Sequence, residues 1–237
     1  MNLIPAQGER ALIVGKTGQG KTAFFTWMAR RIEAAPLIIY DTKIEPKFSA
    51  LPNSAMAETI GDVENLIDAG ESDYIVWRPS IEILDKPQLL DQLLLWHYHN
   101  AQGLPAYIDE AYMFHVNSQA GPGLTALMTR GRSKGITTIV SSQRPSRISR
   151  FCITEIDKAF LFRLQDKKDR VRVDDLIEDF SGLVVPRKHH FYFFDAADDM
   201  EKPQLMAPVK LDAAMDQGYV DKQANSVPVS KKAGLWL

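Results

Sequence analysis

Cysteine is almost absent from this chain of 237 residues, since Cys152 is the only one. A single thiol excludes an intramolecular disulfide and a metal cluster held by cysteines, and it is compatible with a reducing, intracellular compartment. Long apolar runs are also absent, because stretches such as Leu93–Trp96 are far too short to cross a bilayer. The N-terminus has no apolar segment preceded by basic residues, which a secretory signal requires. We therefore expect a soluble protein with no direct membrane span.

The chain also lacks a strong overall charge, with 28 Lys+Arg against 30 Asp+Glu and a formal net charge of −2. The charges are unevenly distributed. The segment from Arg130 to Arg172 holds twelve basic and four acidic residues, a net charge of +8, so the rest of the chain carries −10. A local basic sector can hold a polyanion on a protein that remains soluble. Solvated surface charges would give the same pattern, so charge alone leaves both interpretations open.

Hydrophobic residues make up 45% of the sequence, which supports a sizeable core, and the length fits one α/β domain. Short apolar runs alternate with segments of helical periodicity, and several runs are apolar throughout, as in strands covered on both faces. The sequence predicts an α/β fold with a mostly parallel central sheet, helices on both faces and a C-terminal extension. The predicted strands are Ala11–Val14, Leu37–Tyr40, Tyr74–Trp77, Ala106–Ile108, Ile136–Val140, Ala159–Phe162 and His190–Asp195, and the predicted helices are Lys21–Ala34, Gly61–Ala69, Lys86–Asn100, Pro122–Arg132 and a piece around Val171–Phe180.

Residues 15–22 match the phosphate-binding loop G-x-x-x-x-G-K-[ST], with an apolar strand before them and a helix-compatible segment after them. Glycines let backbone N–H groups turn inward around phosphate oxygens, and the next helix directs its positive dipole end at the anion. Lys21 would reach the β- and γ-phosphates, and the Thr22 hydroxyl would ligate Mg²⁺. The sequence thus predicts a site for ATP. Its cofactor-binding residues are Gly15, Lys16, Thr17, Gly18, Gln19, Gly20, Lys21 and Thr22.

The run Pro105–Ala111 is an apolar strand that ends in two carboxylates, which is the pattern of a Walker B motif. Asp109 is predicted to bind the nucleotide-associated Mg²⁺, usually through water, and Glu110 to polarise the attacking water as general base. A base for water favours ATP hydrolysis over phosphoryl transfer to a small acceptor. A solvated turn or a helix N-cap would also explain an Asp-Glu pair, but the phosphate-binding loop upstream favours the catalytic interpretation.

A third region combines arginines with a strand that ends in a polar amide. Gln143 follows the predicted strand Ile136–Val140 and is expected near the γ-phosphate, where it would sense phosphate or water. Arg130 and Arg132 precede that strand and are candidate fingers, because a guanidinium from a neighbouring subunit can neutralise charge that develops on the γ-phosphate. Ordinary surface or DNA-facing charges remain the alternative for both arginines.

Taken in order, these motifs resemble those of HerA/FtsK-type ATPases. The resemblance covers about Arg10 to Asp195, and the Gln-Arg-Pro-Ser block is its most specific part. The matching segments are the phosphate-binding loop, Ile39–Lys43, Tyr107–Ala111, Gly135–Ser146 and Phe162–Asp169. The resemblance implies a RecA-like P-loop NTPase fold. It also implies a homo-oligomeric ring, hexameric or pentameric, that hydrolyses ATP to ADP and phosphate and translocates double-stranded DNA. By position, Arg132 matches the family's arginine finger better than Arg130.

Among the branches of this family, the chain looks like the genome-packaging ATPases of tailless, membrane-containing icosahedral viruses, because it shows none of the extra domains or membrane anchors of the other branches. That similarity implies packaging into a preformed capsid, in the host cytoplasm or at the virion packaging vertex, with vertex proteins and double-stranded DNA as partners. We predict an ATPase domain at residues 1–200 and a C-terminal extension at 201–237. The predicted DNA contacts are Arg144, Arg147, Lys167 and Lys168.

Three alternatives stay open at this point. The first is another HerA/FtsK-type pump, for plasmid transfer or phage assembly. The second is a RecA-like ATPase that binds single strands, and single-stranded DNA would then stimulate it more strongly. The third is an assembly protein switched by ATP, whose slow hydrolysis would not respond to DNA.

Overall fold

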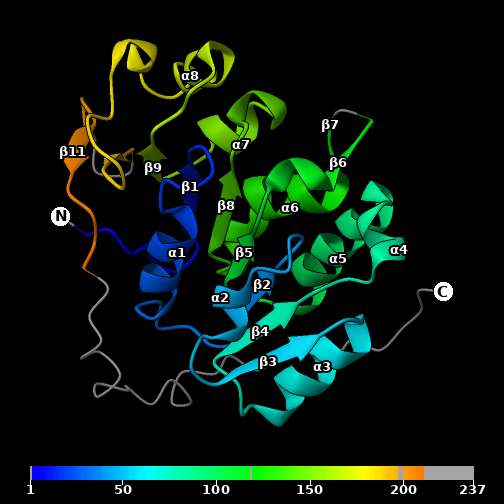
Figure 1. The fold of residues 1–237 in the computed structure, drawn as a ribbon. Coiled ribbons are helices and arrows are strands. Elements are labelled where there is room, and N and C mark those ends of the chain that lie inside the picture. Colours follow the sequence, from blue (N-terminus) through cyan, green and yellow to red (C-terminus); the bar gives the residue numbers. More distant parts are fainter. Residues whose placement is uncertain (1, 118, 197–199, 211–237) are drawn as a thin grey trace.

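A nine-stranded sheet organises the computed structural model, which describes residues 2–117, 119–196 and 200–210 (Figure 1). The strand order is β11-β10-β9-β1-β8-β5-β2-β4-β3. The seven strands from β9 to β3 run parallel, and β10 and β11 add antiparallel strands at one edge. The strands are β1 (Arg10–Val14), β2 (Leu37–Tyr40), β3 (Ser54–Ala57), β4 (Tyr74–Trp77), β5 (Ala106–Ile108), β8 (Thr138–Ser142), β9 (Lys158–Phe162), β10 (Phe191–Asp195) and β11 (Gln204–Met206).

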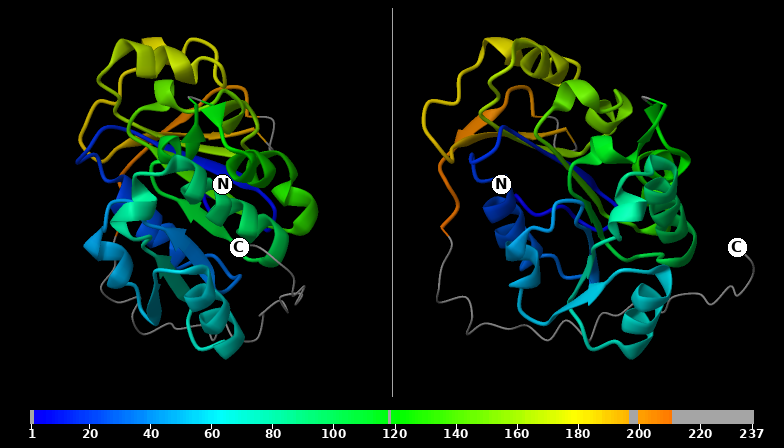
Figure 2. Two further views of the ribbon diagram at one scale, coloured as in Figure 1. Left: turned by 90° about the vertical axis from the view of Figure 1, so that its right-hand side faces the viewer. Right: turned by 45° about the vertical axis from the view of Figure 1, so that its right-hand side comes forward.

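Helices cover both faces of this sheet (Figures 1 and 2). The α-helices are α1 (Lys21–Ala29), α2 (Pro46–Ser49), α3 (Ile60–Ala69), α4 (Ile81–Leu84), α5 (Pro87–Asn100), α6 (Pro122–Arg130), α7 (Phe151–Thr154) and α8 (Lys167–Val173). The 3₁₀ helices are η1 (Ala111–Phe114), η2 (Gly131–Lys134), η3 (Pro145–Arg147) and η4 (Phe180–Gly182). A small hairpin of β6 (His115–Val116) and β7 (Gln119–Ala120) follows η1.

The central strand β1 divides the core into two layers, because successive side chains of a strand point to opposite faces. Leu12 and Val14 pack in the cluster that includes α3, α5, α6 and α7. Ala11 and Ile13 pack against α1 and α2 in a second, aromatic-rich cluster with Phe24 and Phe25. Both faces of β1 are fully buried, as predicted from its continuous apolar run. The mostly parallel sheet with helices on both faces confirms the predicted fold class.

Several predicted boundaries were wrong. The strand predicted at Ile136–Val140 is β8, Thr138–Ser142, because Gly131–Lys134 forms a 3₁₀ turn that closes with an Ile136 N–H to Gly131 carbonyl bond of 3.0 Å. That turn also ends α6 at Arg130. Helix α1 ends at Ala29, five residues before the predicted end. A tighter turn follows, in which the Arg31 N–H donates to the Met28 carbonyl. The proline that follows at 36 disfavours helix at the residue before it.

Two edge strands and one helix start were not anticipated. β3, at one edge of the sheet, lacks the continuous burial of the central strands, since only Ala57 of its four residues is buried and Met56 is exposed. Helix α8 begins at Lys167, four residues earlier than predicted, because the Asp166 carboxylate caps it by accepting a 2.8 Å bond from the Lys168 N–H. β11 lies within the predicted extension and pairs with β10. Residues 211–237 of that extension lie outside the described residues, so the division at residue 200 stays a prediction.

Within the described residues, no helix combines the length and apolar character that a membrane crossing needs.

Candidate nucleotide-binding site

The order of the strands brings the predicted motifs to one edge of the sheet. β1, β8, β5 and β2 are consecutive, parallel neighbours, so the loops that follow them lie side by side. Residues 15–22 follow β1, Gln143 follows β8, and Asp109 and Glu110 follow β5. The carboxyl edge of a parallel α/β sheet is where such folds bind their ligands.

Backbone hydrogen bonds hold the loop at residues 15–20 against the segments that end β8 and follow β9. The Gly15 N–H donates to the Ser142 carbonyl at 3.2 Å, and the Lys16 N–H donates to the Arg163 carbonyl at 3.0 Å. Gly15 has a φ of +155°, and an ideal Cβ there would lie 2.5 Å from Phe162 Cβ. This position therefore requires glycine, so that β1 can turn sharply beside β9.

The loop delivers cationic and N–H groups to the start of α1. The Lys21 ammonium reaches back across the loop and donates to the Gly15 carbonyl at 2.6 Å. Burial lowers the pKa of Lys21 to about 8, because the nearby Glu110 carboxylate, which raises this pKa, offsets the effect of burial only in part. No side chain caps the first turn of α1, whose N-cap residue is Gly20. The N–H groups of that turn are thus available to an anion, and the helix dipole favours one there.

Asp109 and Thr22 are suited to a hard cation. Asp109 Oδ1 accepts hydrogen bonds from Ser141 Oγ at 2.7 Å and from the Tyr107 hydroxyl at 3.3 Å. Burial raises the pKa of Asp109, opposed by the Ser141 bond. Among the described residues, neither Asp109 Oδ2 nor the Thr22 hydroxyl makes a side-chain hydrogen bond, which leaves two oxygens of the kind that Mg²⁺ prefers.

Glu110 and Gln143 are in direct contact, which no spacing in the sequence indicates. Glu110 is 1% exposed and adopts a left-handed backbone with φ of +53°. Its Oε2 accepts a 3.1 Å hydrogen bond from the Gln143 N–H, and its Oε1 pairs with the Lys43 ammonium. The Gln143 side-chain Oε1 accepts a 2.5 Å hydrogen bond from the Thr17 hydroxyl. Gln143 thus links the phosphate-binding loop to the predicted base, a position suited to its predicted sensor role.

Arg130 and Arg132 lie at the other edge of the sheet. Both precede β8, whose N-terminal residue Thr138 pairs with Arg10, whereas the phosphate-binding loop follows the far end of β1. Arg132 is 57% exposed at its side chain and pairs with Asp157 at 3.3 Å. Neither arginine can therefore reach the nucleotide site of its own chain. Their predicted roles stay predictions. As fingers they could act only in the site of a neighbouring subunit, and an exposed Arg132 also fits the alternative of an ordinary surface or DNA-facing charge.

A cavity of about 590 Å³ adjoins the phosphate-binding loop, and two of the four predicted DNA contacts line it. Arg144 is paired with Asp166 at 3.5 Å and with Asp169 at 3.4 Å. Arg147 lies in η3 and Lys168 in α8, both exposed. The cavity is lined by Lys16, Thr17, Gln143, Arg144, Gln165, Asp166, Lys167 and Asp169. Arg144 and Lys167 thus lie closer to the nucleotide site than the sequence indicated.

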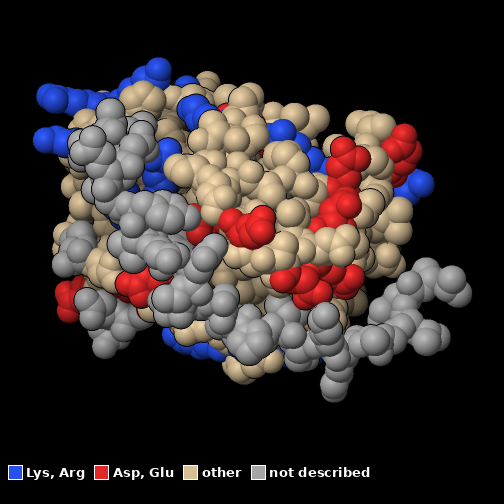
Figure 3. Space-filling view, turned by 90° about the horizontal axis from the view of Figure 1, so that it is seen from below, with Lys and Arg blue, Asp and Glu red and all other residues tan. Residues whose placement is uncertain are grey.

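The basic sector of the sequence does not form one basic face. Lys158 is buried and pairs with Asp195 at 2.6 Å, and Arg150 pairs with Asp175 at 3.4 Å. Its residues are also divided between the two edges of the sheet, since Arg132 precedes β8 and Arg144 follows it. On the face seen in Figure 3, acidic side chains lie across the middle and basic ones mainly at the margins. The net charge of +8 therefore describes a stretch of sequence and not a surface.

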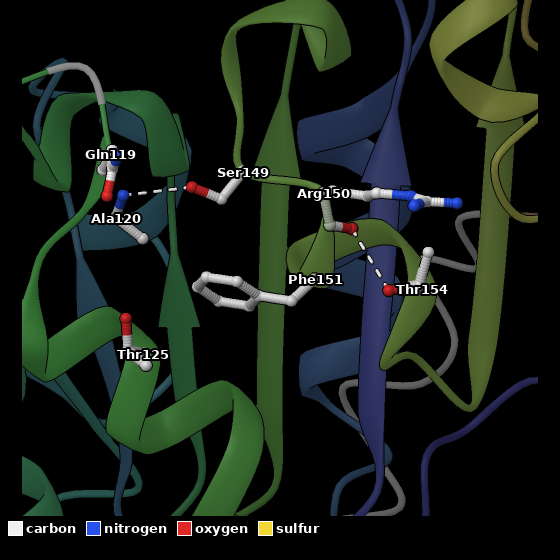
Figure 4. A pocket seen from close by; sticks show the side chains of 7 residues that line it. All are labelled: Gln119, Ala120, Thr125, Ser149, Arg150, Phe151 and Thr154. Carbon is white, nitrogen blue, oxygen red and sulfur yellow. Dashed lines mark hydrogen bonds between the residues drawn. The ribbon is translucent and has the colours of Figure 1, made fainter.

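A second cavity, of about 600 Å³, lies between the β6–β7 hairpin, α6 and α7 and includes none of the predicted site residues (Figure 4). At its rim Ser149 Oγ accepts a 3.0 Å hydrogen bond from the Ala120 N–H, and the Ser149 N–H donates to His115 Nε2 at 2.9 Å. Burial lowers the pKa of His115, which favours this acceptor role. These contacts tie the hairpin that follows the Walker B strand to the segment that follows Gln143.

Three residues at the site were assigned no role from the sequence. Lys43 belongs to the segment that resembles the ATPase family, yet only the β5–β2 pairing shows that it meets Glu110. Ser141 lies inside a strand, where nothing distinguishes it from a packing residue. His189 is distant in sequence, but its Nδ1 would lie 2.9 Å from a Cβ placed on Gly20. Each depends on a long-range contact, so no local pattern indicates it.

Comparisons with known proteins agree with this geometry. No family model matches the chain. Its structure is similar to the genome packaging NTPase B204 from Sulfolobus turreted icosahedral virus 2 in complex with AMPPCP, with a TM-score of 0.66, 18% identity and coverage of 85% of this chain and 98% of that one. It is also similar to the cytoplasmic domain of the Thermomonospora curvata Type VII secretion ATPase EccC, with a TM-score of 0.54, 15% identity and coverage of 98% of this chain and 29% of that one. At these identities, the two structures support the fold alone.

The sequence comparison goes further. Over 203 residues the chain is 30% identical to the DNA packaging ATPase P9 of Enterobacteria phage PRD1, which covers 81% of this chain and 84% of P9. The matched span is too long to consist of the phosphate-binding loop and Walker B strand alone. This chain therefore belongs to the family of viral DNA packaging ATPases that includes P9.

Proposed function

We propose that this chain is an ATP-driven motor that moves double-stranded DNA into a preformed viral capsid. The observation that carries the proposal is the family relationship to P9, a DNA packaging ATPase, together with the loops of β1, β8 and β5 meeting at one edge. B204, whose fold is similar, is a genome packaging NTPase and was solved in complex with nucleotide analogues. The motor would work as a ring of six or five copies at the packaging vertex, with vertex proteins as partners.

The residues of the site divide the work of hydrolysis. The phosphate-binding loop and Lys21 hold the phosphates, and the buried Lys21 ammonium donates to the carbonyl of Gly15, the first residue of the loop. Mg²⁺ bound by Thr22 and Asp109 would neutralise charge on the β- and γ-phosphate oxygens. Glu110 accepts a proton from the attacking water. Gln143 contacts both Thr17 of the phosphate-binding loop and Glu110, so a movement of the loop would be transmitted to Glu110.

A neighbouring subunit completes the site in this proposal. Arg132, or Arg130 beside it, lies at the edge remote from its own phosphate-binding loop and would neutralise the γ-phosphate of the next copy. Arg144, Arg147, Lys167 and Lys168 would contact DNA phosphates without reading sequence. Of these, Arg144 is the weakest candidate, because two aspartates hold it.

The test is the ATPase rate of the purified protein with no DNA, with linear double-stranded DNA and with single-stranded DNA, each over a salt series. We expect double-stranded DNA to stimulate hydrolysis most, and the stimulation to fall as salt weakens phosphate contacts. Stronger stimulation by single strands would favour the RecA-like alternative. A rate that no DNA changes at any salt concentration would contradict the motor and favour an ATP-switched assembly protein.

A further inference from the structure

A chain of side-chain contacts crosses the nucleotide edge of the sheet from strand to strand. Thr17 after β1 contacts Gln143 after β8, Gln143 contacts Glu110 after β5, and Glu110 contacts Lys43 after β2. The order of these contacts is the order of the strands in the sheet. The contacts therefore join the phosphate-binding loop to the loop that carries Lys43.

Both oxygens of Glu110 take part in this chain of contacts. The Lys43 ammonium pairs with Oε1, the Gln143 N–H donates to Oε2, and the side chain is 1% exposed. A general base needs an oxygen that can face the water whose proton it removes. Departure of Lys43 would open Oε1 of this buried carboxylate to such a water.

The loop that carries Lys43 is held firmly at its base and exposed at its tip. The buried Asp41 carboxylate accepts bonds from the Lys43 N–H at 3.2 Å, from the Glu45 N–H at 2.9 Å and from Arg78 Nε at 2.7 Å. Ile44 has a φ of +56° and is 62% exposed. A β-branched residue in the left-handed region is strained, and no burial of Ile44 offsets that strain. The backbone is thus fixed so that Lys43 is presented on a flexible four-carbon side chain.

Lys43 also lies near the place where the terminal phosphate belongs. Its side chain is 38% exposed, and its charge acts on the Lys21 ammonium as well as on Glu110. The P-loop lysine is the residue that contacts the β- and γ-phosphates in such sites. A γ-phosphate next to Lys21 would therefore present Lys43 with a second anion, one that carries more charge than a single carboxylate.

We infer that Lys43 exchanges its ammonium between the Glu110 carboxylate and the γ-phosphate of bound ATP, so that a nucleoside triphosphate, and not a diphosphate, frees Glu110 to act as base. This inference rests on the proposed function of the site. It assigns Lys43 as a γ-phosphate sensor that couples the identity of the nucleotide to the position of the base.

The test is a double-mutant cycle on nucleotide affinity. The non-hydrolysable analogue AMPPCP and ADP are titrated against the wild type, Glu110→Gln, Lys43→Met and the double variant. We expect Glu110→Gln to tighten AMPPCP binding about tenfold and ADP binding less than about twofold, because Lys43 is then free for the phosphate. In the Lys43→Met background the same Glu110→Gln change should alter AMPPCP affinity less than about twofold.

The outcomes separate this inference from simpler explanations. If Glu110→Gln tightens AMPPCP binding equally or more in the Lys43→Met background, the gain in affinity comes only from removing the repulsion between the Glu110 carboxylate and the phosphate. That result overturns the inference. Equal effects on AMPPCP and ADP would overturn it too. Lys43→Arg should keep the coupling, and Lys43→Gln, which also removes the charge, replaces Lys43→Met in the cycle if the methionine variant does not fold. Lys47→Met, which removes an exposed lysine from the same segment, should leave both affinities unchanged. Failure of the wild type to bind AMPPCP would instead contradict the proposed function.

Discussion

At the scale of the residue, Gly15 is a position of the phosphate-binding loop that accepts only glycine. Its φ of +155° lies in a region that side chains rarely adopt, and a Cβ would collide with Phe162 at 2.5 Å. Gly18 shares the unusual backbone, with a φ of +77°, but a Cβ there would meet nothing within 4 Å. The two glycines of one loop therefore separate the cost of a strained backbone from the cost of a steric clash.

We predict that Gly15→Ala lowers the free energy of unfolding by about 2–4 kcal/mol, because backbone strain and overpacking add, and weakens ATP binding about tenfold or more. Gly18→Ala should cost about 1 kcal/mol, from backbone strain alone. Urea unfolding and nucleotide titration measure both effects. Equal losses in the two variants would mean that the contact with Phe162 is unimportant.

In the proposed function, Glu110 is the base that distinguishes an ATPase from a protein that only binds nucleotide. We predict that Glu110→Gln lowers the hydrolysis rate about 10²–10⁴-fold, because the amide cannot accept the proton of the attacking water, while ATP still binds. A steady-state phosphate-release assay paired with nucleotide titration checks both parts. Glu33→Gln, a change at an exposed carboxylate on the surface, is the matched control and should retain the wild-type rate. Rapid turnover by Glu110→Gln would remove Glu110 as the base.

At the scale of elements, buried polar contacts hold α5 and β2 in register. His97 of α5 is fully buried, with its Nδ1 2.9 Å from the Tyr40 hydroxyl and its Nε2 3.0 Å from the Leu104 carbonyl. Because a carbonyl only accepts, Nε2 carries the proton and Nδ1 accepts from Tyr40. Helix α6 is anchored in a related way, since the buried Asp91 of α5 accepts from the Gly123 and Leu124 N–H groups at 2.7 and 2.9 Å. Because these polar groups are buried, the fold is stable only if each keeps its hydrogen-bond partner.

His97 makes stability depend on pH. Burial lowers its pKa from 6.5 to about 4, so the unfolded chain binds more protons than the folded one between these values. The contribution of neutral His97 to stability is fully present above pH 6.5 and is lost as the pH drops toward 4, by up to about 3 kcal/mol. Urea unfolding at pH 7, 6, 5 and 4.5 measures the slope. His97→Gln, although less stable throughout, should have a shallower slope by about one proton in this range, and an unchanged slope would assign the effect to other groups.

At the scale of the whole molecule, the sheet separates the two parts of the proposed motor site. The phosphate-binding loop and the Walker B carboxylates lie at the carboxyl edge, and Arg132 lies at the amino edge beside Asp157. With this arrangement, Arg132 could act as a finger only in the site of a neighbouring copy. Its position is therefore compatible with the proposed ring, which the family resemblance implies.

We predict that Arg132→Ala lowers hydrolysis about 10³–10⁵-fold, and that mixing it with Glu110→Gln before assembly restores part of the activity. In mixed rings, an intact Glu110 on one subunit would face an intact Arg132 on the next. The phosphate-release rate over a range of mixing ratios measures the recovery. Arg130→Ala in the same experiment identifies which arginine acts. No recovery at any ratio, with assembly verified, would leave the trans role unsupported.

Local patterns were sufficient to predict the phosphate-binding loop, because its proposed phosphate-binding groups are contiguous, and the strand before Asp109 and Glu110, because it is apolar throughout. Strands β2, β4 and β5 were predicted with correct bounds because buried parallel strands are apolar throughout. The edge strand β3 and the start of β8 were not, since the first is half exposed and the second depends on the turn at Gly131–Lys134. The predicted roles of Gln143, Arg130, Arg132 and the DNA contacts remain to be tested.

The sequence by itself predicted a P-loop nucleotide-binding fold, because the groups that would hold phosphate lie within eight consecutive residues. Only the tertiary structure decided which loops meet across the strands. Parallel crossovers allow several strand orders, and the order β1-β8-β5-β2 alone brings Lys43 onto Glu110 and Gln143 against Thr17. It also divided the basic residues between two edges of the sheet, since residues on either side of one strand lie a strand's length apart.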